Sequence, residues 1–178
     1  ARPVNFHLNA LGKLGMTHSI KKGYIYANAH KGLKGSIIKF PKISVGATEN
    51  AILAATLAKG KTILKNCAIE PEIKIDLTNF LNKAGARIKW IGKRSVEIDG
   101  VKKLNSISYS VMADRIECGT FCVVAAISKG ELKINGLDPN IITTEIKLLK
   151  KIGAKIKTYD KTILIKGPKK IKSLKFLE

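Results

Sequence analysis

The sequence predicts an α+β fold in which one unit of strand, helix, strand, helix and β-hairpin is repeated. A short motif recurs about every 70 residues, each time at the end of a Leu-containing helix: Lys13-Leu14-Gly15-Met16, Lys83-Ala84-Gly85-Ala86 and Lys151-Ile152-Gly153-Ala154. Two short runs rich in β-forming residues follow every copy, as expected for a hairpin. This regular period indicates a protein assembled from βαβαββ modules, in which two helices cover each sheet.

Three copies of the module can be followed along the chain. The first, within 1–29, is only a tail, with a helix expected at 5–14 and hairpin strands at 17–20 and 24–27. The second is complete over 35–100, and the elements expected in it are strands at 36–40 and 62–66, helices at 47–58 and ending at Lys83, and a hairpin at 87–91 and 95–98. The third covers most of a module over 108–167, with a helix opening at 114–120, a strand at 131–135, a second helix, and a hairpin at 155–159 and 162–165.

The helix expected at 47–58 is the best defined element. It contains no Gly or Pro, and small or apolar residues recur at spacings of three and four, which predicts one buried face: Ala51, Ile52, Ala54, Ala55 and Ala58. Gly60 is a suitable C-terminal stop. The same end recurs as Ala125 to Gly130, which supports the repeat.

A polar loop, Lys42-Ile43-Ser44-Val45-Gly46, leads into that helix. Free backbone N–H groups and the positive end of the helix dipole at such a start can hold an anion, and Lys42 adds a full charge. Ser and Gly are also common at helix starts for capping alone. The loop is therefore a candidate phosphate site, but helix capping alone would also explain its residues.

The formal charge of +20, from 33 basic and 13 acidic residues, raises nucleic acid as a partner. Nucleic-acid readers usually gather Arg and aromatic residues on one surface. Here the lysines are scattered over every element, and only four basic residues are arginines: Arg2, Arg87, Arg94 and Arg115. We favour lysine at solvated positions and expect no specific nucleic-acid binding, but a basic binding module remains the alternative of a different class.

Three cysteines form a sparse, odd set that is typical of a reducing compartment. Cys118 and Cys122 lie four apart in an apolar segment without a nearby His, which favours core packing over metal ligation. No run approaches the roughly 18 apolar residues of a membrane span, and the first ten residues lack the regions of a signal peptide. We expect a cytoplasmic protein with no membrane contact, metal or cofactor.

Several motifs strongly resemble the UDP-N-acetylglucosamine 1-carboxyvinyltransferase family, the enolpyruvyl transferases of peptidoglycan synthesis. The matching motifs are Ala1-Arg2-Pro3-Val4, Leu33-Lys34-Gly35, Lys42 to Asn50, Glu70-Pro71-Glu72-Ile73 and Asp114 to Phe121. The resemblance runs in order over essentially all 178 residues but covers less than half of the family's usual length. Because the first residue is Ala, we also expect a piece of a longer chain.

The resemblance implies two lobes, each an α/β prism, or inside-out α/β barrel, of three βαβαββ modules. Residues 1–111 would then be the C-terminal part of the first lobe, and residues 112–178 the start of the second, with a crossover near Met112. The implied reaction transfers the enolpyruvyl group of phosphoenolpyruvate to the 3-hydroxyl of UDP-N-acetylglucosamine. The implied setting is cell wall biogenesis in the cytoplasm, which supports cell shape, the cell cycle and cell division.

The resemblance also implies where the sugar nucleotide lies. Arg2 would pair with its anionic oxygens, Pro3 and Val4 would wall the uracil, and Lys42 with the following loop would hold the diphosphate. The implied substrate-binding residues are Arg2, Pro3, Val4, Asn5, Phe6, Lys42, Ile43, Ser44, Val45 and Gly46. His7 matches a family histidine, for which we expect a hydrogen-bonded structural role.

The sequence departs from the family at a few positions. Asn5 and Phe6 stand where Asp and Leu are usual, and Cys118 replaces a Thr. After Glu70-Pro71-Glu72-Ile73, both Lys74 and Ile75 precede Asp76, so the following helix must absorb one extra residue. The shikimate-pathway relative is a second candidate, but it typically has Ser-x-Gln at the helix start that begins at Ser44.

The family's reactive cysteine would come just before Ala1, and its proton-accepting carboxylate and phosphoenolpyruvate-binding arginines would come after the last residue. None of the three cysteines matches the reactive one, so we expect no catalytic residue in this chain and no transfer by it alone. The expected partners are the two substrates and the remainder of the two-lobed chain. For Arg115 we expect an ion pair with Asp114 and Glu117 rather than a ligand contact.

Overall fold

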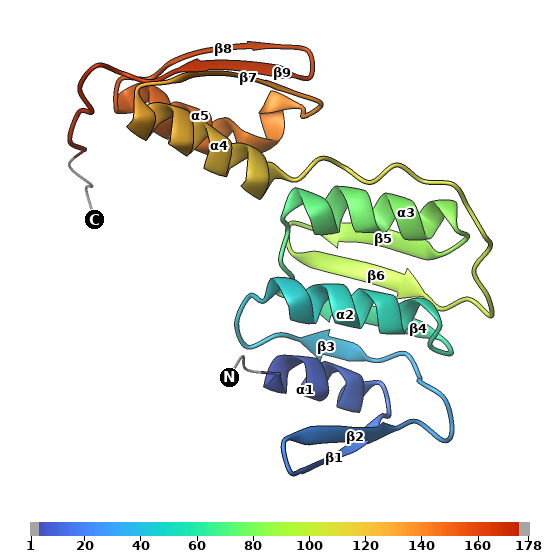
Figure 1. The fold of residues 1–178 in the computed structure, drawn as a ribbon. Coiled ribbons are helices and arrows are strands. Elements are labelled where there is room, and N and C mark those ends of the chain that lie inside the picture. Colours follow the sequence, from blue (N-terminus) through green and yellow to red (C-terminus); the bar gives the residue numbers. More distant parts are fainter. Residues whose placement is uncertain (1–3, 175–178) are drawn as a thin grey trace. The chain divides into compact units, whose positions relative to one another are not determined.

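The structure is a computed structural model that describes residues 4–174. The chain divides into two compact units, Ala1–Ser110 and Val111–Glu178, each with a hydrophobic core of its own. Figure 1 shows the elements of both units in chain order. No helix among the described residues is long and apolar enough to cross a membrane.

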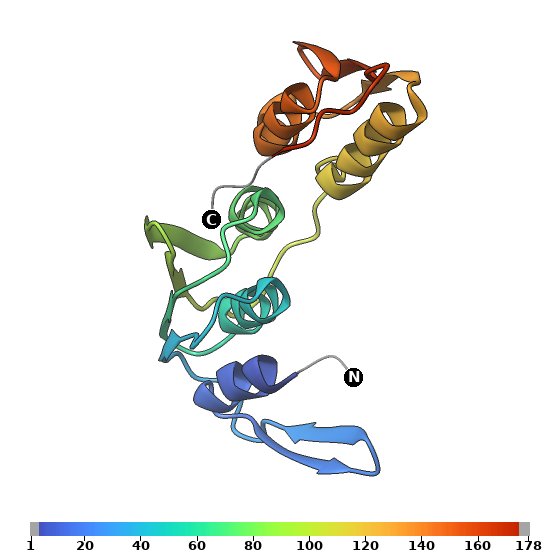
Figure 2. The same ribbon diagram turned by 90° about the vertical axis from the view of Figure 1, so that its left-hand side faces the viewer.

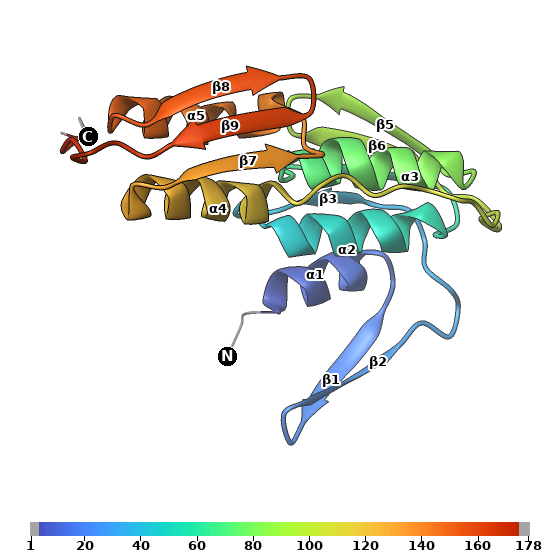
Figure 3. The same ribbon diagram turned by 45° about the horizontal axis from the view of Figure 1, so that its top comes forward.

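The first unit begins with a helix and a hairpin. Helix α1 (Asn5–Lys13) is followed by the antiparallel strands β1 (Thr17–Lys21) and β2 (Tyr24–Asn28). The two turn residues have positive φ, 50° at Lys22 and 81° at Gly23, as a two-residue hairpin turn requires. Both strands are exposed along their whole length, and the ribbon extends away from α1 (Figure 3).

The rest of the first unit is the complete βαβαββ module that the repeat predicts. Its elements are β3 (Ile37–Lys39), α2 (Val45–Thr56), β4 (Lys61–Lys65), a π-helix (Glu72–Leu77) continuing into α3 (Thr78–Lys83), β5 (Arg87–Gly92) and β6 (Ser95–Asp99). The strand order is β3-β4-β6-β5, with β3 parallel to β4 and the other pairs antiparallel. Figure 2 shows α2 and α3 on the same side of this sheet.

The small-residue face of α2 allows close packing in this core. Ala51, Ile52 and Ala55 are fully buried, and Leu64, Val96 and Ile98 of the sheet are buried in the same cluster. Helix α1 also packs against α2, with Ala10 and Leu14 in the cluster. The core therefore joins the tail of one module to the whole of the next.

The π-helix lies where the sequence predicts an extra residue. A π-helical turn takes one residue more than an α-helical turn, so residues before and after it keep their positions on the helix face. Ile73 and Leu81 accordingly both reach the core. The Thr78 hydroxyl donates to the carbonyl of Ile73, five residues back, at 3.0 Å, and the Trp90 indole donates to the same hydroxyl at 3.1 Å.

The second unit contains five of the six elements of a module. These are α4 (Arg115–Ser128), β7 (Glu131–Asn135), α5 (Thr143–Lys151) preceded by a 3-10 turn (Pro139–Ile142), β8 (Lys155–Tyr159) and β9 (Thr162–Lys166). The sheet order is β7-β9-β8, all antiparallel. No strand occurs in the stretch from Val101 to Asp114, so among the described residues this module lacks the counterpart of β3.

Candidate functional site

The N-terminal ends of α1 and α2 lie side by side (Figures 1 and 2). The two helices pack against each other, and the Asn50 amide nitrogen lies 3.2 Å from Nδ1 of His7. This arrangement brings together two segments that are about 40 residues apart in sequence, the start of α1 and the loop before α2. Both helix dipoles present their positive ends there, which suits an anionic ligand.

The loop before α2 has the geometry of a capped helix start. Ser44 is the N-cap in extended conformation (φ −143°, ψ 120°), and its hydroxyl accepts from the Ala47 N–H at a long 3.4 Å. The Thr48 hydroxyl donates to the Ser44 carbonyl at 2.7 Å and holds that residue in place. The first N–H groups of a helix have no acceptor within it, so those of Val45 and Gly46 are available to bind an anion at this end of α2.

The side chains of this loop are open to solvent. Lys42, Ile43 and Val45 are exposed, and Ser44 and Gly46 are half-buried. The ammonium group of Lys42 can therefore reach an anion at the helix start without leaving a buried position.

The start of α1 can be placed only in part. Arg2 and Pro3 lie outside the described residues. Val4 precedes the helix and Asn5 begins it, and both are exposed. Phe6 is half-buried, and its side chain packs against the hydrophobic core of the first unit. A cavity of about 510 Å³ adjoins Phe6, but it is lined from α1, β1 and β3 and contains none of residues 42–46.

Three acidic side chains, Glu49, Glu70 and Glu72, interact electrostatically near the start of α2, and sequence reasoning did not bring them together. The pKa of Glu49 is raised by partial burial and by the charges of Glu72 and Glu70, while His7 lowers it. One oxygen of Glu70 is buried without a hydrogen-bond partner among the described residues. A site for phosphate here therefore depends on its basic residues and N–H groups to offset nearby negative charge.

Asn50 is the neighbour of the candidate loop that sequence reasoning missed. It lies four residues after Gly46, on the same side of α2, and this spacing was the available signal. His7 has the hydrogen-bonded role expected of it, since it pairs with Asn50.

All three cysteines are buried, and for Cys118 and Cys122 this confirms the packing predicted from their apolar segment. Burial raises the pKa of Cys67 and Cys122 to about 12 and also raises that of Cys118. Thiols of this kind are poor nucleophiles at neutral pH because so little thiolate is present. Within residues 4–174 no group of three His, Cys, Asp or Glu side chains could hold a metal ion.

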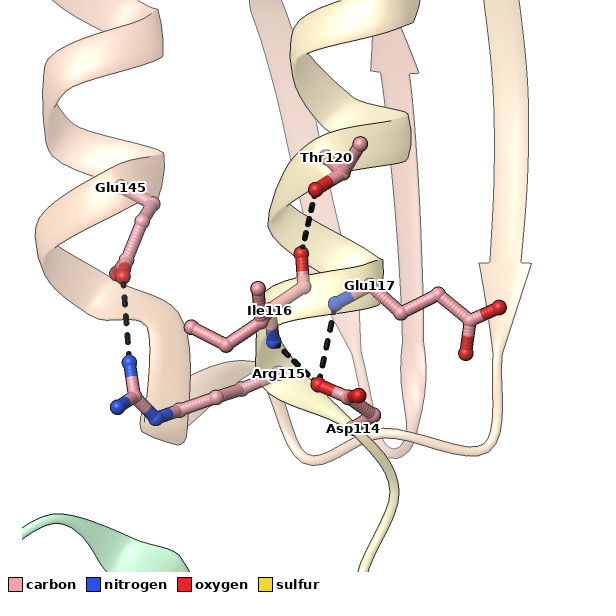
Figure 4. A network of polar contacts seen from close by, with 6 residues as sticks. All are labelled: Asp114, Arg115, Ile116, Glu117, Thr120 and Glu145. Carbon is pink, nitrogen blue, oxygen red and sulfur yellow. Dashed lines mark hydrogen bonds and ion pairs between the residues drawn. The ribbon is translucent and has the colours of Figure 1, made fainter. Parts of the chain in front are cut away.

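The prediction that Arg115 pairs with Asp114 and Glu117 at the start of α4 was wrong. Asp114 is the N-cap, and its carboxylate accepts from the N–H groups of Ile116 at 2.7 Å and Glu117 at 3.1 Å. Arg115 instead extends to α5, where Nη1 lies 3.9 Å from Oε1 of Glu145 (Figure 4). Side chains one or two residues apart do not face each other on a helix, so neither Asp114 nor Glu117 is well placed to pair with Arg115.

The fold and the paired helix starts define an α+β protein built of βαβαββ modules with a candidate anion site between two modules. The EPSP synthase (3-phosphoshikimate 1-carboxyvinyltransferase) family model matches residues 1–176, and the chain belongs to that family.

Two curated relatives show where in the family the chain falls. It is 61% identical over 173 residues to the UDP-N-acetylglucosamine 1-carboxyvinyltransferase of Pelagibacter ubique, which covers 97% of this chain and 41% of the relative. It is 46% identical over 172 residues to the enzyme of the same name from Endomicrobium trichonymphae, again covering 97% and 41%. The chain thus spans about two fifths of the length of these relatives, and the resemblance read from its motifs is confirmed.

Solved structures confirm the predicted fold. The enolpyruvyl transferase NikO from Streptomyces tendae matches with a TM-score of 0.77 at 19% identity, over 94% of this chain and 43% of that one. EPSP synthase from Acinetobacter baumannii matches with a TM-score of 0.69 at 24% identity, over 97% and 41%. At these identities the likeness establishes the architecture alone.

Proposed function

We propose that this chain supplies the nucleotide-sugar-binding wall of a UDP-N-acetylglucosamine 1-carboxyvinyltransferase. The observation that carries the proposal is the loop Lys42-Ile43-Ser44-Val45-Gly46 at the start of α2, beside the start of α1. The 61% identity to the Pelagibacter ubique enzyme supports it. In this proposal residues 1–111 belong to one lobe and residues 112–178 to the other.

Each part of the site has a distinct task in the proposal. The Lys42 ammonium group and the N–H groups of Val45 and Gly46 bind the diphosphate, because charged donors form the stronger hydrogen bonds to phosphate oxygens. The Ser44 hydroxyl can also bind the diphosphate. Its hydrogen bond from the Ala47 N–H is long, at 3.4 Å, so losing that bond would cost little. Ile43 forms an apolar side of the loop. Arg2 binds anionic oxygens, and residues 3–6 surround the uracil.

The chain would bind the sugar nucleotide without transferring the enolpyruvyl group. Transfer needs a group that takes the proton of the sugar hydroxyl and one that gives a proton to phosphoenolpyruvate. The three thiols are buried with raised pKa values, so none of them suits that work at neutral pH. We assign those steps to further residues of a two-lobed protein that works in the cytoplasm on a peptidoglycan precursor, and thereby in cell shape and division.

Calorimetric titration of the purified chain with UDP-N-acetylglucosamine tests the proposal. We expect saturable binding that Lys42→Ala weakens about tenfold or more, as the loss of a charge-assisted contact would. Lys39→Ala is the matched control, because Lys39 is an exposed lysine of β3 just before the loop. Equal affinity of the Lys42→Ala variant and the unmodified chain would count against this site.

The alternatives give different results in the same titration. Tight binding of shikimate 3-phosphate with no response to the UDP sugar would assign the chain to the shikimate branch. A preference for particular DNA or RNA sequences would support the basic binding module, whereas salt-sensitive binding without preference reflects the net charge alone.

A further inference from the structure

We infer that His7 is a positioning residue, which holds the start of α1 at a set distance from the phosphate-binding loop of α2. The inference rests on the proposed function, since it concerns how the two halves of that site are held together. His7 lies in the first turns of α1, directly after the segment assigned to the uracil. Its imidazole lies 3.2 Å from the Asn50 amide nitrogen and occupies the space that a side chain at Gly46 would need.

The contact with Gly46 is a close approach to helix backbone. A Cβ atom added at Gly46 would lie 3.3 Å from Cε1 of His7 and 3.5 Å from Nε2. Gly46 lies within α2 and is not among the glycines with positive φ, so its backbone conformation does not require glycine. Glycine inside a helix is less favourable than alanine, and the space taken by the imidazole gives a reason for it here.

The contact with Asn50 fixes the imidazole along α2. Asn50 follows Gly46 by one helical turn, so the ring spans the first turn of α2 from the loop to the amide. The Asn50 amide nitrogen lies 3.2 Å from Nδ1, and since an amide nitrogen can only donate, Nδ1 is the acceptor of this hydrogen bond. The ring is thereby held in one orientation against the loop.

Apolar contacts of α1 serve a different purpose. Leu8, Ala10 and Leu14 are buried and attach the helix to the core. Within residues 4–174, the hydrogen bond of His7 with Asn50 is the polar side-chain contact between α1 and α2, and it lies at the end where the candidate site is. Small misplacements of binding groups cost affinity, so a residue that sets the spacing of two loops acts on binding more than on folding.

Calorimetric titration with UDP-N-acetylglucosamine, together with the thermal midpoint of each variant, tests this role. We expect His7→Ala and Asn50→Ala each to weaken binding about five- to tenfold. The affinity of the double variant should be close to that of either single variant, because both substitutions remove the same contact. His7→Gln should recover most of the affinity, because its amide oxygen can accept from Asn50. Asn9→Ala, an exposed polar change on α1, is the control and should bind normally.

The outcomes separate this inference from the proposed function. If His7→Ala binds normally while Lys42→Ala does not, the positioning role is overturned and the proposed function stands. A lower thermal midpoint with unchanged affinity at a temperature where the variant is folded, or losses that simply add in the double variant, would also overturn it. If the unmodified chain does not bind the UDP sugar, the proposed function fails and the positioning role fails with it.

Discussion

The hydroxyl of Thr48 in α2 accepts a hydrogen bond from the backbone N–H of Ala68 at 3.1 Å, and both residues are fully buried. The same hydroxyl donates to the Ser44 carbonyl at 2.7 Å. Thr48 thus connects the cap of the candidate loop to the segment that follows β4. One side of the loop is therefore fixed by the buried hydrogen bonds of Thr48, and the other side is open to solvent.

Replacing Thr48 by Val tests this connection. The change keeps the side-chain shape but leaves the Ala68 N–H buried without a partner, so we expect the free energy of unfolding to fall by about 1 to 3 kcal/mol. Urea unfolding followed by the fluorescence of Trp90 reports on this unit, since Trp90 is the one tryptophan of the chain. Thr17→Val removes an exposed hydroxyl bonded to the Asn28 carbonyl and should change stability by less than about 0.5 kcal/mol. Equal effects of the two substitutions would contradict the structural role.

Neutralising Glu49 should stabilise the protein at pH 7. Its pKa in the folded protein is raised by partial burial and then by Glu72 and Glu70, so the folded state binds the proton more tightly than the unfolded state. Stability therefore falls as the pH rises from about 4.5 through the folded pKa, and the loss remains at pH 7. Glu49 lies beyond the first turn of α2, where the helix dipole contributes little.

We expect Glu49→Gln to be more stable than the unmodified chain at pH 7, by up to about 0.5 kcal/mol because solvent screens the repulsion. The difference should shrink as the pH is lowered below about 4.5. Glu97→Gln gives a control of opposite sign, because its carboxylate pairs with Lys61 at 2.8 Å. A Glu49→Gln variant that is less stable at pH 7 would show that the carboxylate is favourably paired.

Deleting Lys74 should convert the π-helix into regular α-helix without loss of the fold. Lys74 is exposed within the π-helix, and removing it leaves Ile73 and Leu81 in phase on the core side. We expect the free energy of unfolding, followed by Trp90 fluorescence, to change by less than about 1 kcal/mol.

Deleting the exposed Asn79 from α3 is the matched comparison. It removes a residue between Thr78 and Leu81, which are both buried on α3, so one of the two must turn by about 100° away from the core even if the π-helix relaxes. This should cost about 3 kcal/mol or more as core contacts are lost. If deleting Lys74 is as damaging as deleting Asn79, the π-helix is not the place that holds the extra residue.

Several parts of the fold could be predicted from the sequence because their signals are local. The Lys22-Gly23 turn, the Ser44 start of α2 and the strands of the second and third hairpins depend on residues within a few positions of each other. The periodic motif placed these elements into modules. The burial of Cys118 and Cys122 followed in the same way from their spacing on one apolar helix face.

Other features needed the packed chain. The extra residue near Lys74 was visible in the sequence, but its form as a π-helix was not, because α and π turns differ only in which carbonyl the N–H groups reach. The Arg115 pairing was wrong because the relevant partner, Glu145, lies 30 residues away on another helix.

The sequence by itself determined the βαβαββ repeat, the family resemblance and the loop from Lys42 to Gly46, since each depends on residue type and spacing along the chain. Only the tertiary structure decided that His7 pairs with Asn50 and fills the space beside Gly46, and that the charges of Glu70 and Glu72 act on Glu49. The physical reason is that helix periods and caps act over one or two turns, whereas the spacing between helices is set by how their side chains pack in a common core.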